Sequence, residues 1–394
     1  MTKVDNGPKI DVITVVVDRT LNRAAIDDAL IKRGLNQSAL AEQLQVSREA
    51  VSKWLRGDCF PKPAKLLRMG MLLGLPFAQL VISPLPTAVP VVCFRKKSHR
   101  VTRDEHLDNA RETGELLKRL VKYLPQQPLT LPPTLKHPAT DYHYVQSVAA
   151  QARTEMKLQD REVIDFGDLI EKFNQLHAVL VPALWGERQY HGNALNIHLP
   201  DSKTTWVFLN LDSNAIDFKF WIAHELGHSL APELTGDACE DFADAFAQAL
   251  LFPESHAAKL RPDLQRLTNV GARINRVHKE ASKHVISPYT IRRALESYEE
   301  ANNLPKTDLG QLGSFMGSVT NFTKSYRTIT QSLFKSQPPK PAEYIKAGRS
   351  AFDSPFFEAL ASFCKSEQSP EHFIHRVLGV SLADARALDR ELRK

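Results

Sequence analysis

The segment spanning residues 215–230 (AIDFKFWIAHELGHSL) places the strongest constraint on how this chain folds. It contains no proline, carries apolar residues at helical spacing and follows the turn-forming residues Asp212, Ser213 and Asn214, so it predicts a helix. Side chains four residues apart lie on one face of a helix, about 6 Å from each other. His224 and His228 are therefore placed to bring two imidazole nitrogens to one tetrahedral Zn²⁺ ion.

A carboxylate lies inside this His-Glu-x-x-His motif, and a second predicted helix follows it at residues 239–253. Glu225 adjoins the first histidine but is rotated off the ligand axis, so we expect it to take a proton from water rather than to bind the metal. Gly227 would let this helix approach another backbone closely. Glu240 is the expected third ligand, which leaves the fourth position open for water, and Asp244 is expected to accept the N–H of a ligating histidine. The alternative is a pair of surface histidines on an amphipathic helix.

These two segments resemble the motifs of the ImmA/IrrE metallopeptidases. The similarity consists of AHELGH at residues 223–228 and, from Glu240, the pattern E-x-x-A-D-x-F-A-x-x-L-L-x-P. The chain departs from the family at Asp244, where Asn is usual, and at Phe252, where Met is common. The resemblance covers residues from about 144 to about 296. It implies a cytoplasmic, zinc-dependent regulatory peptidase of zincin-like (gluzincin-type) fold that removes a helix-turn-helix repressor by cleavage.

The N-terminal sequence predicts a bundle of short helices over residues 24–33, 37–45, 48–56 and 62–73. Its predicted core has the spacing of a helix-turn-helix, with Ala41, Leu44, Val46, Val51 and Trp54. The string Q-x-x-L-A-x-x-L-x-V-S-x-x-x-V-S-x-W-x-x-G at residues 37–57 resembles Cro/XRE-type DNA-binding domains. The resemblance implies binding to a double-stranded DNA operator.

In such a domain, the helix at residues 48–56 would enter the major groove by its N-terminal half. The residues expected to contact DNA, in the groove or at phosphates, are Gln37, Ser47, Arg48, Glu49, Ser52, Lys53, Arg56, Lys62 and Lys65. Each of them could instead lie on a solvated helix face, and the whole domain could bind a protein partner. The basic run at residues 95–100 is either a phosphate contact or an ordinary hinge.

The chain between and after these modules has weaker signals. Residues 83–90 and 125–138 are proline-rich linkers, and residues 102–124 predict a helix between them. Residues 177–184 and 204–211 predict strands, and we expect the free edge of the second strand to hold an extended substrate backbone. Between these strands, Tyr190 or His191 could stabilise an oxyanion, although a surface loop pair is the simpler interpretation. The last fifty residues predict helices at 351–365, 369–378 and 381–394, with His372 and His375 on the surface.

Composition fits an intracellular protein. The formal net charge is +6, and the four cysteines have no paired spacing that would indicate a disulfide framework. The apolar run at residues 12–17 is too short to span a bilayer, so we expect no membrane contact and a cytoplasmic location.

The predicted fold is α+β, mainly α with a small β-sheet. The expected division is a helix-turn-helix domain (1–82), linkers with a central helix (83–140), a zinc peptidase domain (141–300) and a helical C-terminal region (301–394). The predicted function is that of a transcriptional regulator whose zinc endopeptidase cleaves a repressor or itself in stress, phage or mobile-element control, with a homodimer as one possible assembly. The alternative is a non-proteolytic transcription factor, or an antitoxin-like regulator, whose zinc fold is a sensor or support.

Overall fold

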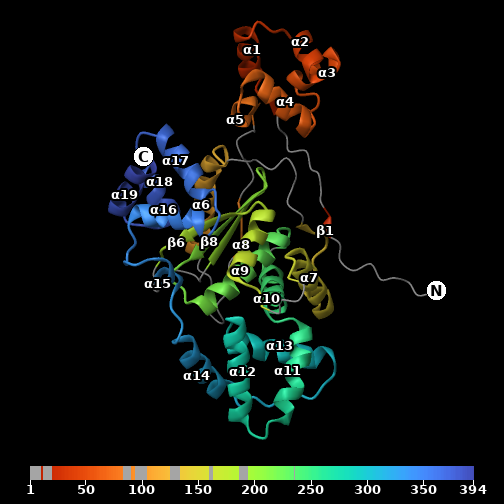
Figure 1. The fold of residues 1–394 in the computed structure, drawn as a ribbon, viewed down its shortest axis with the longest axis vertical. Coiled ribbons are helices and arrows are strands. Elements are labelled where there is room, and N and C mark those ends of the chain that lie inside the picture. The colour runs from red at the N-terminus through yellow and green to blue at the C-terminus, as the bar shows by residue number, and fades with distance from the viewer. Residues whose placement is uncertain are drawn as a thin grey trace, which may run out of the picture.

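The computed structural model describes residues 10–11, 20–82, 90–93, 104–124, 134–158, 163–185, 194–234 and 236–394. Within these residues the protein is mainly helical and carries a small mixed sheet (Figure 1), as predicted. The basic run at 95–100, Tyr190 and His191 lie outside the described residues, as do most of the two proline-rich linkers. No helix in the described part of the chain is long and apolar enough to cross a bilayer.

Five helices form the N-terminal unit around a hydrophobic core of their own. They are α1 (Arg23–Lys32), α2 (Gln37–Leu44), α3 (Arg48–Arg56), α4 (Pro63–Leu73) and α5 (Phe77–Leu80). The predicted bounds of α3 are confirmed, because Ser47 caps its start and Gly57, at φ 85°, ends it. The unit is closed by antiparallel pairing of β2 (Thr20–Leu21) with β3 (Val81–Ile82), which brings its two ends together.

A four-stranded sheet has the order β4-β7-β8-β6. Its strands are β4 (Val91–Cys93), β6 (Val179–Ala183), β7 (Ala194–Leu199) and β8 (Thr204–Asn210). β8 pairs parallel with β6 and antiparallel with β7, so it is an interior strand. The expectation that this strand offers a free edge to a substrate is therefore wrong. Every residue of β6 and β8 is buried, which fits strands covered on both faces.

Two groups of helices pack against this sheet. One contains α6 (Asp104–Val121) and α17 (Phe356–Ser366), and the other contains α8 (Phe166–Gln175) and α9 (Ala215–Leu230). Helix α10 (Asp237–Leu251) packs along α9 and also contacts α7 (Tyr142–Glu155). A short pairing of β1 (Ile10–Asp11) with β5 (Thr134–Leu135) lies outside the main sheet.

After α10 the chain leaves the sheet and later returns to it (Figure 1). The outgoing helices are α11 (Glu254–Arg266), α12 (Val270–His284), α13 (Pro288–Ala301) and α14 (Leu312–Thr323). The returning helices are α15 (Ile329–Leu333), α16 (Pro341–Ser350), α17, α18 (Glu371–Leu378) and α19 (Leu382–Leu392). A single hydrophobic cluster contains residues from Leu117 to Leu392.

The start of α17 differs from the prediction of a helix from residue 351. The helix begins only at Phe356, because Asp353 has a left-handed backbone with φ 45° and Pro355 follows Ser354. A residue before proline is driven away from helical conformation, which delays the helix by about one turn.

Candidate metal centre

Helix α9 carries the His-Glu-x-x-His motif and has the bounds predicted from the sequence. Asn214 caps it by accepting hydrogen bonds from the backbone N–H groups of Ile216, at 3.1 Å, and Asp217, at 3.0 Å. From Trp221 to Leu230 every residue is buried. The alternative of two surface histidines is therefore wrong, since His224 is 1% exposed and His228 is 4% exposed.

Three side chains converge between α9 and α10. The Nε2 atoms of His224 and His228 are 3.0 Å apart. The carboxylate oxygens of Glu240 lie 3.5 Å from His224 Nε2 and 3.4 Å from His228 Nε2. A tetrahedron whose corners are about 2.0–2.1 Å from a zinc ion has corner-to-corner distances of about 3.3 Å. The observed spacing therefore fits one ion bound by two imidazole nitrogens and one carboxylate.

The surroundings of Glu240 also fit a cation. Both of its carboxylate oxygens are buried and make no hydrogen bond within the described residues. A buried carboxylate is costly unless a hydrogen bond or a positive charge compensates it. A bound divalent ion would supply that compensation.

Glu225 lies next to these atoms. It is 3% exposed, and one of its carboxylate oxygens lies within 4.8 Å of ligand nitrogens of both His224 and His228. This placement suits a base acting on a water molecule at the centre, and it would also leave Glu225 within reach of an ion bound there.

A second carboxylate orients the first histidine from the other side of its ring. Asp244 Oδ1 is 2.9 Å from His224 Nδ1. Burial disfavours the charged form of His224, but the neighbouring carboxylates of Asp244, Glu240 and Glu225 outweigh burial and raise its pKa to about 9. Three carboxylates therefore surround this imidazole, and this concentration of negative charge suits a cation.

The contact of Cys239 with His228 was not anticipated from the sequence. Its Sγ atom lies 3.1 Å from His228 Nδ1, and the side chain is buried. Its position directly before Glu240 was the available signal.

The close approach expected at Gly227 is present. A Cβ atom built on this glycine would lie 3.0 Å from the Cα atom of Ala243 and 3.2 Å from a ring carbon of Phe246. Helix α10 is therefore in backbone contact with α9 beside the histidines. This contact brings Glu240 within reach of them.

The sheet also contacts α9 through hydrogen bonds. Asn196, on β7, donates to the Glu225 carbonyl and to Ser229 Oγ, both at 3.4 Å. Ser229 in turn donates to the Glu225 carbonyl at 2.9 Å. The backbone carrying Glu225 is thus fixed to β7 by a buried amide.

The candidate DNA-contacting residues lie on α2, on α3 and at the start of α4. Arg48, Glu49 and Lys62 are exposed. The Ser47 hydroxyl accepts from the Ala50 backbone N–H at 3.1 Å, so it serves as the α3 cap. Lys65 Nζ donates to the Leu44 carbonyl at the end of α2, at 2.7 Å, rather than pointing free toward a phosphate.

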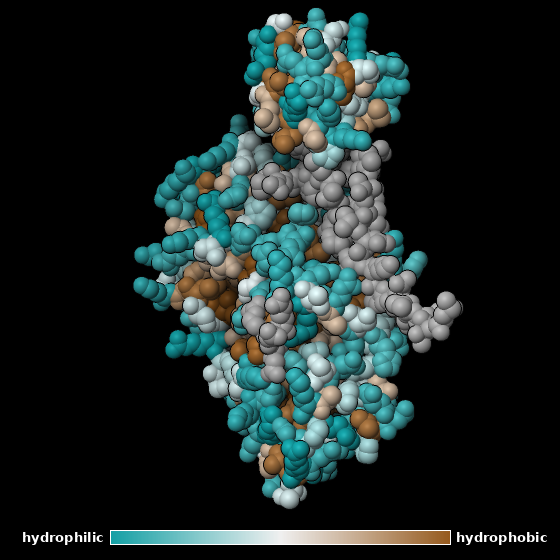
Figure 2. Space-filling view, turned by 45° about the vertical axis from the view of Figure 1, so that its right-hand side comes forward, coloured by the Kyte–Doolittle hydropathy of each residue, from teal (hydrophilic) through white to brown (hydrophobic). Residues whose placement is uncertain are grey.

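The other candidates are half-buried or ion-paired on the surface. Gln37 and Ser52 are half-buried. Lys53 pairs with Glu49 at 3.0 Å, and Arg56 pairs with Asp58 at 2.9 Å. Exposed pairs of this kind are weak and can be exchanged for phosphate contacts. The surface of this unit, at the top of Figure 2, is largely hydrophilic with scattered hydrophobic residues.

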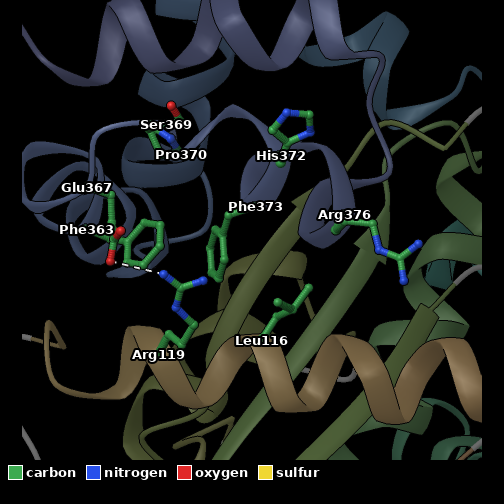
Figure 3. A pocket seen from close by; sticks show the side chains of 9 residues that line it. All are labelled: Leu116, Arg119, Phe363, Glu367, Ser369, Pro370, His372, Phe373 and Arg376. Carbon is green, nitrogen blue, oxygen red and sulfur yellow. Dashed lines mark hydrogen bonds and ion pairs between the residues drawn. The ribbon is translucent and has the colours of Figure 1, made fainter.

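A cavity of about 230 Å³ lies between α6 and the C-terminal helices, away from the metal residues (Figure 3). Its lining includes Phe363 and Phe373, with the Arg119 guanidinium 4.9 Å and 5.4 Å from the centres of the two rings. Arg119 also pairs with Glu367 at 3.0 Å. These contacts attach α17 and α18 to α6.

Comparison with known proteins identifies the N-terminal unit. Residues 26–80 match the helix-turn-helix family HTH_3, so the chain carries an N-terminal helix-turn-helix domain. No peptidase family matches the chain, and no curated protein matches it. The crystal structure of ComR from Streptococcus suis is similar at 11% identity over 94% of this chain and 92% of that chain. The TM-score between the two chains is 0.14.

Proposed function

We propose that this protein is a DNA-binding transcriptional regulator that contains a zinc-dependent endopeptidase centre. The helix-turn-helix domain indicates transcriptional regulation. The peptidase part rests on one observation: two imidazole nitrogens and one carboxylate lie 3.0–3.5 Å from one another, at the spacing of a zinc tetrahedron. In this proposal His224, His228 and Glu240 hold the ion.

A zinc ion held by these two histidines and this carboxylate would act as a Lewis acid, polarising a carbonyl group and making water more acidic. Glu225 then takes the proton of the attacking water and delivers it to the leaving amine. Asp244 accepts the Nδ1–H of His224, which holds the ring with Nε2 toward the centre. The Asn196 amide keeps the Glu225 backbone in place during these proton transfers.

The proposed substrate is a repressor bound to the same operator, or this chain itself. A peptidase joined to a DNA-binding domain has a high effective concentration near proteins on neighbouring DNA. Cleavage of a repressor there would change transcription directly. For self-cleavage, the proposed sites are the proline-rich segments at residues 83–90 and 125–138, where a cut would separate DNA binding from the metal centre.

The test combines metal analysis with proteolysis by the full chain. We expect about one zinc ion per chain, loss of the ion in His224→Ala, and retention of the ion without proteolysis in Glu225→Gln. Candidate repressors are incubated with each variant, with and without operator DNA, and intact masses are followed over time. Absence of zinc from the wild type, or its loss from Glu225→Gln, would contradict these assignments.

A second function is favoured by the burial of the centre. His224, Glu225 and His228 are each less than 5% exposed, which suits a metal that supports or reports on the fold. In that case the chain is a non-proteolytic regulator. Glu225→Gln would then bind zinc and regulate its operator as the wild type does, whereas His224→Ala would be impaired in both.

A further inference from the structure

The thiol of Cys239 is part of the arrangement around the second histidine. Cys239 lies in the first turn of α10, directly before Glu240. Its side chain is 2% exposed, and Sγ is 3.1 Å from His228 Nδ1. The proposed metal chemistry does not use this contact.

The two edges of the His228 ring face different partners. Nε2 faces His224 Nε2, at 3.0 Å, and Glu240, at 3.4 Å, so it points to the proposed ion. Nδ1 is on the other edge of the ring and faces the sulfur. A sulfur atom there lies beyond the ring from the ion that Nε2 would bind.

His224 has a matching arrangement. Its Nε2 faces the same centre, and its Nδ1 is 2.9 Å from Asp244, which is also on α10. Each histidine of α9 is therefore contacted at its outer nitrogen by a side chain of α10. Such outer contacts select which nitrogen carries the proton and hold the ring in one rotation.

We propose that Cys239 is a positioning residue for the metal centre. The Nδ1–H of neutral His228 donates to Cys239 Sγ, which leaves Nε2 unprotonated and directed at the ion. This inference rests on the proposed metal site and assigns the cysteine no contact with the ion itself. Sulfur is a weak acceptor, but the 3.1 Å separation from Nδ1 is within hydrogen-bonding distance.

The same atoms allow a second arrangement, which the experiment must distinguish from the positioning role. His228, Cys239 and Glu240 each offer a ligand atom within 4.8 Å of the others, so the thiol could instead bind an ion directly. A thiolate ligand leaves a characteristic absorption when Co²⁺ replaces zinc. A hydrogen-bonded thiol leaves none.

The experiment measures Zn²⁺ affinity of the full-length chain by competition with a chelating dye. We expect Cys239→Ala to weaken zinc binding by about 10- to 100-fold, the usual effect of removing an outer hydrogen-bond partner. Cys239→Ser keeps an acceptor on a shorter bond and should recover most of that loss. Cys59→Ala, on the exposed thiol of the helix-turn-helix domain, is the matched control and should bind zinc as the wild type does.

Thermal melting of the metal-free variants separates loss of affinity from loss of the fold. Equal zinc affinity of Cys239→Ala and the wild type would overturn the positioning role. A near-ultraviolet thiolate-to-cobalt band in the Co²⁺-loaded wild type, absent from Cys239→Ala, would overturn it by making Cys239 a ligand. If the wild type binds no metal, the proposed function fails as well, which distinguishes that result from failure of this inference alone.

Discussion

Replacing Gly227 with alanine tests whether the contact between α9 and α10 builds the metal centre. The added Cβ would lie 3.0 Å from the Ala243 Cα atom and 3.3 Å from the Ala243 Cβ atom, closer than ordinary carbon contacts. The nearest atom belongs to the α10 backbone, so the helix itself must move by a few tenths of an ångström. Glu240 is on α10 and both histidines are on α9, so this movement should open the ligand triangle.

Two opposing effects determine how much Gly227→Ala changes the free energy of unfolding. Overpacking a well-packed core costs about 1–3 kcal/mol, whereas alanine favours a helix over glycine by about 1 kcal/mol. We therefore expect the free energy of unfolding to fall by up to about 2 kcal/mol. Gly317 is the matched control, because it lies within α14 and a Cβ there meets nothing within 4 Å. Gly317→Ala should gain about 1 kcal/mol.

The assay is urea denaturation of the metal-free variants, followed by zinc competition on the folded proteins. We expect Gly227→Ala to lose about tenfold in zinc affinity, a change of about 1.4 kcal/mol. Gly317→Ala should bind zinc as the wild type does. If Gly227→Ala gains stability like the control and binds zinc with unchanged affinity, the close approach of these helices is not what positions Glu240.

Three further results are expected. Glu240→Ala should weaken zinc binding more than Asp244→Ala does in the same competition assay, because a lost ligand costs more than a lost outer partner; the reverse order would make Asp244 the ligand. In DNA-binding titrations, Arg48→Ala should reduce discrimination between operator and random duplex, whereas Lys62→Ala should weaken both equally and lower the salt dependence. Burial lowers the pKa of Lys219 from 10.5 to about 8, so the unfolded chain binds more protons between these values and stability should rise with pH there. Relative to Lys219→Met, urea denaturation should show a rise of at most about 3 kcal/mol from pH 8 to 10.5, and no difference in slope would contradict the shift.

The elements most accurately predicted from the sequence are those with strong local signals at both ends. Helix α3 is bounded by Ser47 and Gly57, and α9 begins after Asn214, so short-range capping determines where these helices start or stop. The spacing of the histidines within α9 is likewise a local property. For this reason the sequence alone places two of the candidate ligands on one helix face.

The remaining features depend on contacts between distant segments. The interior position of β8 follows from its pairing with both β6 and β7, which no local pattern in its apolar sequence specifies. The contact of Cys239 with His228 joins two helices and depends on how they cross. The spacing of residues along one helix predicts partners on that helix, but it cannot predict which side chain a second helix brings to the outer edge of an imidazole.

Residues beyond 301 form hydrogen bonds at the start of α9, the helix that carries the two histidines. The Ala215 N–H donates to the Arg327 carbonyl at 3.0 Å, and the Ile329 N–H donates to the Ser213 carbonyl at 3.0 Å. The returning chain therefore pairs with the four-residue connection between β8 and α9, at the point where α9 begins. Thr330 extends this contact, because its hydroxyl donates to Asp212 at 2.7 Å.

This pairing means that residues 327–330, which are distant in sequence from the His-Glu-x-x-His motif, fix the position where α9 begins. The two histidines lie about 2.5 and 3.6 turns beyond the first residue of α9, so a change at the start of this helix is carried along a stiff element to the candidate ligands. Further along the helix, Asn196 fixes α9 to β7 through the Glu225 carbonyl. The candidate metal centre is thus held by three parts of the chain that are distant in sequence: β7 through a buried amide, α10 through the contact at Gly227, and residues 327–330 through the backbone before α9.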